Sequence, residues 1–225
     1  MNEMAQQSDP LSEVTLAILA GGAGSRMGMA KADLRIGSEP ILGFLLRRLA
    51  WPGPTLLVTA PGREHPPGWE GFTREVADPV GGLGPLRGVL TALEFAATPQ
   101  VVVTPVDMPG VAFPQLRWLA SAFSMERSRR RDVCGLMTCR EMGPRPGWDG
   151  PERRTEPFPA AFHRDAAAPI RARLEAGRGS VQEIAAEPGF IVAAAPDTWA
   201  EAAWVNLNRP ADLQAFLESV GKSMA

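Results

Sequence analysis

The stretch "LAILAGGAGSRMGMAK", residues 16–31, joins an apolar run to four glycines, an arginine and a lysine. The apolar residues at 14–20 have the length and character of a buried strand. Glycines directly after it leave peptide N–H groups uncovered and permit the positive φ values that a tight anion-binding turn requires. Arg26 adds a rigid guanidinium fork and Lys31 a mobile ammonium. The stretch therefore predicts a strand followed by a loop that binds a polyphosphate, most naturally that of a nucleoside triphosphate.

Two better-known phosphate-binding loops do not fit. A Walker loop places its lysine between glycine and Ser or Thr, whereas Lys31 stands between two alanines. A dinucleotide fingerprint counted from Gly22 and Gly24 requires a glycine where Met27 stands. The alternative that stays open is a glycine-rich turn with incidental surface cations.

The composition favours one soluble globular domain. The 225 residues suit a single α/β domain at 14–225 behind a flexible polar lead-in at 1–13. Hydrophobic residues make up 45% and charged residues 21%, as in globular proteins. Lys plus Arg 23 against Asp plus Glu 25 gives a net charge of −2, so nucleic acid is not the expected partner.

Targeting and cysteine patterns point to the cytoplasm. No Lys or Arg precedes Arg26, and the apolar run at 14–20 is short, so we expect neither a signal peptide nor a membrane span. Cys134 and Cys139 are too few for a disulfide framework or a four-ligand zinc site. Free thiols in a reducing compartment are the simplest interpretation.

Strand and helix patterns alternate along the chain. Alternation of this kind predicts an α/β fold with a mostly parallel sheet covered on both faces, and such sheets bind ligands beyond the carboxyl ends of their strands. The stretch 142–159 is predicted to be a long irregular loop. The expected strands are 14–20, 55–59, 101–104, 133–138, 158–162 and 204–207, and the expected helices are 40–50, 85–97, 114–123, 165–176, 180–186 and 210–220.

The opening motif carries a family resemblance. "LAGGAGSRMG" at 19–28, with Lys31 after it, resembles the signature of the MobA-like nucleotidyltransferases. The resemblance continues, in the family's order, through "ADLRIGSEPIL" (32–42), "DPVGGLGPLRGVLTAL" (78–93), "VVVTPVDMPGV" (101–111), "EPFPAAFHRDAAAPIRARLEAGRGSVQEI" (156–184) and "VNLNRPADL" (205–213). It implies a Rossmann-like three-layer α/β sandwich of the nucleotide-diphospho-sugar transferase type.

The resemblance also implies an activity. By analogy, the enzyme transfers GMP from GTP to a molybdopterin-type molybdenum cofactor and releases pyrophosphate, with Mg²⁺ as cofactor. GTP and the molybdopterin-type cofactor are then its partners, and molybdoenzyme maturation proteins are further candidate partners. The details that resemble the guanylyl type most are "LAGG" at 19–22 and "GPL" at 84–86.

Candidate site residues follow from the motifs. Asp107 comes after the strand 101–104 at the expected ligand edge, and one such carboxylate suffices for Mg²⁺ on a triphosphate. The family's metal aspartate matches it, and Asp78 matches an aspartate that suits the paired N–H donors of guanine, although a turn residue is the alternative there. The predicted catalytic residues are Arg26, Lys31 and Asp107, and the predicted nucleotide-binding residues are Leu19, Ala20, Gly21, Gly22, Gly24, Lys31 and Asp78.

Asn206 and Asn208 are the candidate acceptor-binding residues. On a strand, period-two alternation would point both amides to one face, and the Asn-x-Asn-x-Pro pattern resembles the family's block near the metal and the acceptor. Capping of the last helix is the alternative for Asn208. An acceptor phosphate is already ionised near neutral pH, so no protein base is expected, and His65 and His163 show no catalytic partner spacing.

Departures from the guanylyl type leave two alternatives open. Ala30 stands where aspartate is usual, Arg87 where a small residue is usual, and "VTAPG" at 58–62 replaces a stretch that often carries asparagine. One alternative is a cytidylyl- or other nucleotidyltransferase with a different phosphorylated acceptor. The other is a GTP-binding adaptor that delivers cofactor without turnover. The loop 142–159 either closes over an anionic acceptor or is simply solvated.

Overall fold

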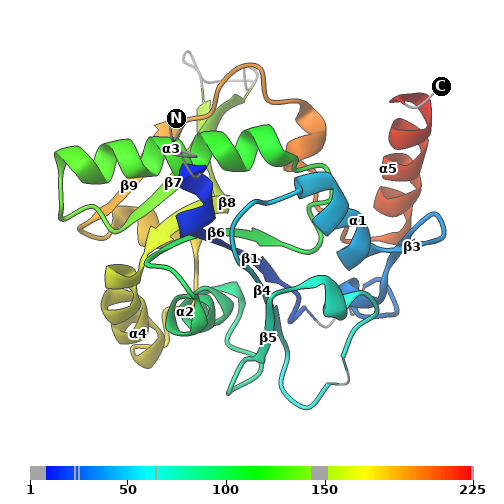
Figure 1. The fold of residues 1–225 in the computed structure, drawn as a ribbon, viewed down its shortest axis with the longest axis horizontal. Helices are drawn as coiled ribbons and strands as arrows, with labels where there is room; N and C mark the ends of the chain where they lie inside the picture. The colour runs from blue at the N-terminus through cyan, green and yellow to red at the C-terminus, as the bar shows by residue number, and fades with distance from the viewer. Residues whose placement is uncertain (1–8, 23, 25, 64, 143–151, 224–225) are drawn as a thin grey trace, which may run out of the picture.

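The computed structural model describes residues 9–22, 24, 26–63, 65–142 and 152–223. Its centre is a seven-stranded sheet in the order β5-β4-β1-β6-β8-β7-β9. Figure 1 shows α3 along one side of this sheet and α2 with α4 along the other, which makes three layers. The strands are β1 (Val14–Leu19), β4 (Thr55–Thr59), β5 (Arg74–Ala77), β6 (Gln100–Pro105), β7 (Gly135–Met142), β8 (Glu152–His163) and β9 (Phe190–Ala194). The helices are α1 (Ile41–Leu49), α2 (Pro85–Phe95), α3 (Phe113–Arg129), α4 (Ala167–Glu175) and α5 (Pro210–Ser223).

The central strand β1 explains the apolar run of the opening motif. It pairs in parallel with β4 on one side and β6 on the other. All six of its residues are buried, because helices cover both faces of the sheet and leave no solvent side to alternate with. The predicted α/β class with a mostly parallel sheet is confirmed.

Strand β8 is the one reversed strand of the sheet as described. It is antiparallel to both β6 and β7, while β7 and β9 are parallel. The first residues of β8 therefore lie at the same edge of the sheet as the last residues of β1 and β6. A two-stranded ribbon of β2 (Arg35–Ile36) and β3 (Glu39–Pro40) stands apart from the main sheet.

Three local predictions need correction. The predicted strand at 204–207 is wrong: Glu201–Trp204 is a 3₁₀ helix, and the chain then runs on without a ladder partner. The prediction of a long irregular loop is wrong for residues 152–159, which belong to β8, while 143–151 lie outside the described residues. The predicted helix at 180–186 is instead a short 3₁₀ segment, Gln182–Ala186.

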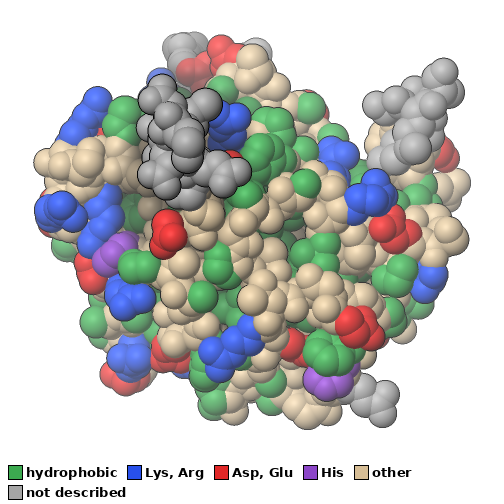
Figure 2. All heavy atoms as spheres, in the orientation of Figure 1, with side chains coloured by type: hydrophobic (Ala, Val, Ile, Leu, Met, Phe, Trp, Pro, Cys, Tyr) green, Lys and Arg blue, Asp and Glu red, His purple; other side chains and the backbone are tan. Residues whose placement is uncertain are grey.

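The core begins before residue 14. Pro10–Glu13, within the predicted lead-in, form a 3₁₀ helix that the Asp9 side chain caps. The side chain of Leu11 is 6% exposed and joins the hydrophobic core. No helix in the described part of the chain has the length and apolar character that crossing a bilayer requires. On the face drawn in Figure 2, Lys and Arg side chains are interspersed with Asp and Glu.

Candidate nucleotide-binding site

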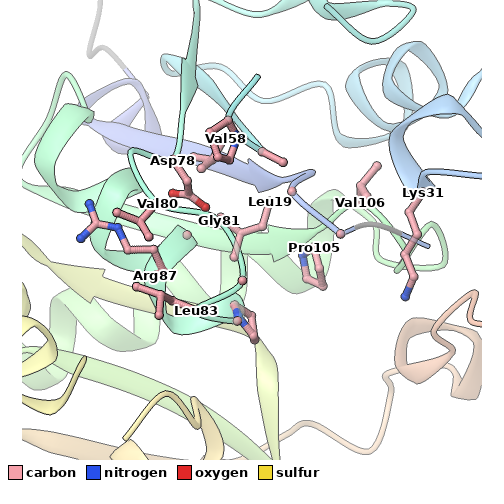
Figure 3. Close-up of a pocket in the computed structure, with 18 of the residues that line it drawn as sticks. Leu19, Lys31, Val58, Asp78, Val80, Gly81, Leu83, Arg87, Pro105 and Val106 are labelled. Atoms are coloured by element: carbon pink, nitrogen blue, oxygen red, sulfur yellow. The ribbon is translucent and has the colours of Figure 1, made fainter. Parts of the chain in front are cut away.

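A cavity of about 480 Å³ opens at the carboxyl ends of β1, β4 and β6. Glycine loops border it on two sides, Gly21 and Gly22 after β1 and the segment 80–84 before α2. Figure 3 shows Lys31 at one end of this space and Asp78 with Arg87 toward the other. The side chains of Leu19, Val58, Val80, Leu83, Pro85 and Val106 line it between those ends.

The glycines of the first loop have two different roles: Gly24 permits the backbone turn, and Gly21 and Gly22 leave space beside the cavity. Gly24 has a φ of +59°, and a Cβ there would collide with the Met29 carbonyl oxygen, so only glycine fits. Gly21 and Gly22 are exposed and line the cavity, and a Cβ on either would meet nothing closer than 3.6 Å. The protein's own packing therefore does not require glycine at these two positions, and the absence of side chains there leaves room for a ligand.

Lys31 joins two residues that are distant in the sequence. Its ammonium donates to Asp107 Oδ2 and, at 2.7 Å, to Asn208 Oδ1. Asp107 follows β6 and is 8% exposed, which places its carboxylate at the edge where the glycine loop begins. Asn208 lies just before α5, and its backbone N–H donates to Asp212 Oδ2 at 2.9 Å. The Asn208 side chain thus contacts Lys31 instead of capping the last helix.

Other predicted site residues lie outside this cluster. Ala20 is buried and donates its N–H to Val58 O in the sheet, so it contributes no cavity wall. Arg26 is exposed in the turn after the loop, beyond the cavity lining that the described residues give. Asn206 is exposed like Asn208, with Leu207 buried between them. Val205 and Arg209 are exposed as well, so the burial does not alternate, and a common face for the two amides stays a prediction.

Comparison with known proteins decides the family. Residues 16–189 match the family described as the MobA-like NTP transferase domain. A protein of Deinococcus radiodurans named "Probable molybdenum cofactor guanylyltransferase" is 32% identical over 206 residues, which cover 89% of this chain and 92% of that protein. This chain is a MobA-like NTP transferase.

Solved structures agree with the MobA-like fold. Molybdopterin-guanine dinucleotide biosynthesis protein A from Archaeoglobus fulgidus superposes with a TM-score of 0.71 at 20% identity, over 92% of this chain and 99% of that one. 2-C-methyl-D-erythritol 4-phosphate cytidylyltransferase from Thermus thermophilus superposes with a TM-score of 0.63 at 21% identity, over 93% and 99%. The nucleotide-diphospho-sugar transferase type of sandwich is confirmed, and the protein is a nucleotidyltransferase by family.

The carboxyl group of Asp78, at one end of this cavity, is partly buried and has a raised pKa. One carboxylate oxygen of Asp78, Oδ1, is buried without a hydrogen-bond partner among the described residues. This burial raises the pKa of the carboxyl, against the lowering effects of the Thr91 hydroxyl and the Arg87 charge, while Glu94 raises it further. A buried acceptor without a donor is costly. The other carboxylate oxygen, Oδ2, lies on the side of the glycine loop, 3.8 Å from the position that a Cβ of Gly21 would take.

Arg87 lines the cavity, and its surroundings could not be read from the sequence. The Arg87 guanidinium donates to Glu94 Oε2 at 3.1 Å, and its Nε is buried without a partner in the described chain. Glu94 Oε1 also accepts from Arg171 of α4 at 2.8 Å. The pair could have been predicted from the sequence, because residues seven apart on a helix are separated by two turns and lie on the same face.

The metal-binding potential of the site can be tested on its donors. Members of the family typically use a divalent metal. Asp107 offers a carboxylate oxygen and Asn208 an amide oxygen, both within hydrogen-bonding reach of one ammonium, and hard divalent cations prefer such oxygen ligands. No group of three His, Cys, Asp or Glu suited to a metal occurs in the described residues. The donors fit a metal that takes its remaining ligands from substrate phosphates and water.

The two histidines lie away from this chemistry. His65 stacks on Trp69 with ring centroids 4.1 Å apart and contacts Glu75 Oε2. His163 is the last residue of β8 and pairs with Gln100, the first residue of β6, at the opposite edge of the sheet. Its pKa is lowered mainly by burial and also by the Arg127 charge.

A group of tryptophans stands beside the segment that carries Asn206 and Asn208. Trp199 and Trp204 stack with centroids 5.2 Å apart, and Trp118 meets Trp199 edge-on at 5.5 Å. Trp199 and Trp204 also help to line a second cavity, of about 230 Å³. We refer to these three side chains as the tryptophan cluster.

Proposed function

We propose that this protein transfers GMP from GTP to a molybdopterin-type molybdenum cofactor, with release of pyrophosphate, in molybdenum cofactor maturation. The curated relatives with this name support the proposal, and so does the polarity of the cavity. The single observation that carries it is that one cavity with apolar walls has Lys31 and the first glycine loop at one end and the Asp78 carboxyl group at the other. This is the order of phosphates, sugar and base in a nucleotide.

The acidic end favours guanine. Guanine presents N1–H and an N2 amine side by side, and a carboxylate accepts such a pair, whereas cytosine lacks it. Asp78 is the carboxylate at that end, and the exposed side chains of Val80 and Leu83 offer apolar surface beside it. We therefore place the base at Asp78 and the phosphates over Gly21, Gly22 and Lys31.

The proposed reaction is an in-line displacement. A phosphate oxygen of the acceptor forms a bond to the α-phosphorus of GTP, the bond from the α-phosphorus to the bridging oxygen breaks, and pyrophosphate leaves with the electron pair. The acceptor phosphate is ionised near neutral pH, so the protein needs no base to activate it. Asn206 and Asn208 are the proposed acceptor contacts.

The protein's part is positioning and charge neutralisation. Lys31, loop N–H groups and Arg26 are proposed to bear on the phosphates, where negative charge moves during transfer. Asp107, with the Asn208 amide oxygen near it, would hold Mg²⁺, whose chemistry here is to neutralise phosphate charge. Removal of one such electrostatic contact typically costs on the order of 10²- to 10³-fold in rate.

The deciding experiment measures pyrophosphate release with GTP, CTP and ATP, with and without molybdopterin, for native protein and Asp107→Asn. We expect GTP-dependent release that needs the acceptor and falls on the order of 10²- to 10³-fold in Asp107→Asn. Asp132→Asn is the matched control, because Asp132 is exposed and pairs with Arg130 on the surface.

Two outcomes would replace the proposal. Native protein that binds GTP but never releases pyrophosphate would be a cofactor-delivery adaptor. Preference for CTP would make the protein a cytidylyltransferase, an activity named for one of its structural neighbours.

A further inference from the structure

The ammonium of Lys31 lies between the two oxygens that the proposed function assigns to metal and acceptor. It donates to Asp107 Oδ2 and to Asn208 Oδ1 at once. The side chain of Lys31 is 17% exposed and that of Asp107 11%, so water weakens this pair less than it would a surface pair. Any cation that takes these oxygens has to displace Lys31.

The two oxygens stand on a rigid frame. The N–H of Leu207 donates to the Asp107 carbonyl at 2.8 Å, which ties the segment before α5 to the end of β6. A Cβ at Gly110 would collide with the Ala202 carbonyl, so the two segments also pack backbone against backbone. The frame holds Asp107 and Asn208 in place, and Lys31 is the member of the cluster with a long flexible stem.

The same lysine faces the expected phosphates. A Cβ at Gly22 would meet the Lys31 side chain, at Cδ, 3.7 Å away, and both residues line the cavity. A polyphosphate on the glycine loop carries more negative charge than Asp107 and Asn208 together. It therefore competes for the ammonium with the pair that holds it.

We propose that Lys31 is a place-holding cation, which the nucleotide draws onto its phosphates and so away from Asp107 and Asn208. Asp107 is then released for the metal and Asn208 for the acceptor. The metal therefore binds with the nucleotide and not before it, and the acceptor binds last. This inference rests on the proposed function in taking GTP as the nucleotide, Asp107 as the metal ligand and Asn208 as an acceptor contact.

The first test measures binding of Mn²⁺ alone, by electron paramagnetic resonance of the free ion, to native protein, Lys31→Met, Lys31→Arg and the double variant Lys31→Met/Asp107→Asn. In native protein, Mn²⁺ has to break the hydrogen bond between the Lys31 ammonium and Asp107. Lys31→Met lacks this bond, so its affinity for Mn²⁺ should be higher by about tenfold or more. Lys31→Arg keeps the cation and should resemble native protein, and the double variant should lose the gain.

The contrary result is equally definite. A lysine that served only the phosphates would leave the affinity for Mn²⁺ alone unchanged in Lys31→Met, and this would overturn the proposal. Lys31→Gln replaces Lys31→Met if the thermal unfolding profile shows that the latter does not fold.

A second test uses the native chain. In the presence of EDTA, GTP should shift the side-chain amide resonances of Asn208, assigned with Asn208→Ser, because the ammonium leaves Asn208 Oδ1. GTP that binds without moving these resonances would contradict the proposal. If GTP does not bind at all, the proposed function fails, and the Mn²⁺ titrations still decide the role of Lys31.

Discussion

At the scale of single residues, the first loop contains glycines of two kinds. Gly24 is a glycine because of the protein's own backbone, since its φ is positive and the Met29 carbonyl leaves no room for a Cβ. Gly22 has no such constraint and faces the cavity. Gly24 is therefore required for the stability of the fold, whereas Gly22 is proposed to serve ligand binding.

We expect Gly24→Ala and Gly22→Ala to fail differently. Gly24→Ala should lower the free energy of unfolding by about 1–3 kcal/mol through backbone strain. Gly22→Ala should leave the melting temperature nearly unchanged and weaken GTP binding by about tenfold or more, because the added methyl keeps the phosphate away from the loop N–H groups and a hydrogen bond to a charged group is lost. Calorimetric melting and GTP titration of both variants distinguish the two effects. Equal GTP affinity in native protein and Gly22→Ala would refute the phosphate role of the loop.

The buried carboxyl of Asp78 predicts a pH dependence. Burial raises its pKa above the ordinary value of an aspartate, and only the ionised carboxylate can accept both guanine donors at once. GTP affinity should therefore fall on acidification, starting at higher pH than an ordinary aspartate would allow, by about tenfold or more when protonation is complete. Stability has the opposite sign, because the cost of burying the charge is present at neutral pH and is relieved as pH falls through the raised pKa.

GTP titrations across pH check the dependence on Asp78. Arg87→Gln should move the midpoint to higher pH, since Arg87 lowers this pKa. In Asp78→Asn, binding should be weak at every pH. A native profile that persists in Asp78→Asn would assign the dependence to another group.

At the scale of elements, the segment 201–208 is held by close backbone contact with the residues that follow β6. Gly110 follows β6 and packs against the Ala202 carbonyl, while Leu207 is tied to Asp107. The contact places Asn208 beside Lys31 although no strand runs through this segment.

Gly110→Ala should therefore disturb the site without touching substrate. The added methyl must push the segments apart, with a loss of about 1–3 kcal/mol in unfolding free energy. Transfer to the acceptor should fall by more than GTP binding does, because Asn208 moves and Asp78 does not. Gly43→Ala in α1 is the control, since its methyl would meet only the Glu39 side chain at 3.6 Å. Pyrophosphate release and GTP titration measure the difference, and an equal loss in both would argue against this role of Gly110.

The elements that the sequence predicted well are those with buried surroundings. β1, β4 and β6 stand in the interior of the sheet, where continuous apolar runs are required, and α2 begins at a proline as expected. β5 and β9 were missed because they are edge strands with partly exposed side chains. The strand prediction for 204–207 was wrong because a buried Leu between two exposed Asn residues does not require a strand. Here a single backbone hydrogen bond, from Leu207 N–H to the Asp107 carbonyl, holds the Leu in place.

The candidate site was predictable to a similar degree. Asp107 and the glycine loop follow buried strands, so their common edge could be expected from sequence. The contact of Lys31 with Asn208 joins positions 177 residues apart and depends on how α5 is approached, which no local pattern records.

At the scale of the whole molecule, one core runs beneath both halves of the sheet. Buried residues from Leu11 to Phe216 belong to a single hydrophobic cluster. The reversed strand β8 connects β5, β4, β1 and β6 on one side with β7 and β9 on the other. We therefore expect the domain to unfold as one unit.

Phe162→Ala tests that expectation. Phe162 is fully buried in β8, and replacement of such a ring by Ala typically costs about 3–5 kcal/mol. Calorimetry should show a single transition that moves as a whole to lower temperature. Phe95→Ala, at a ring that is 38% exposed, should cost much less. Two transitions, of which only one moves, would divide the chain into separate units.

The tryptophan cluster has a practical consequence. Three of the protein's six tryptophans have ring centroids 5.2 Å and 5.5 Å apart, and at this spacing we expect excitation energy to pass between them. They stand where the chain enters the segment of Asn206 and Asn208, and Arg140 lies 5.6 Å from the Trp204 ring. We therefore expect the tryptophan fluorescence to change when an acceptor reaches its proposed contacts at Asn206 and Asn208, so that binding can be followed without a label.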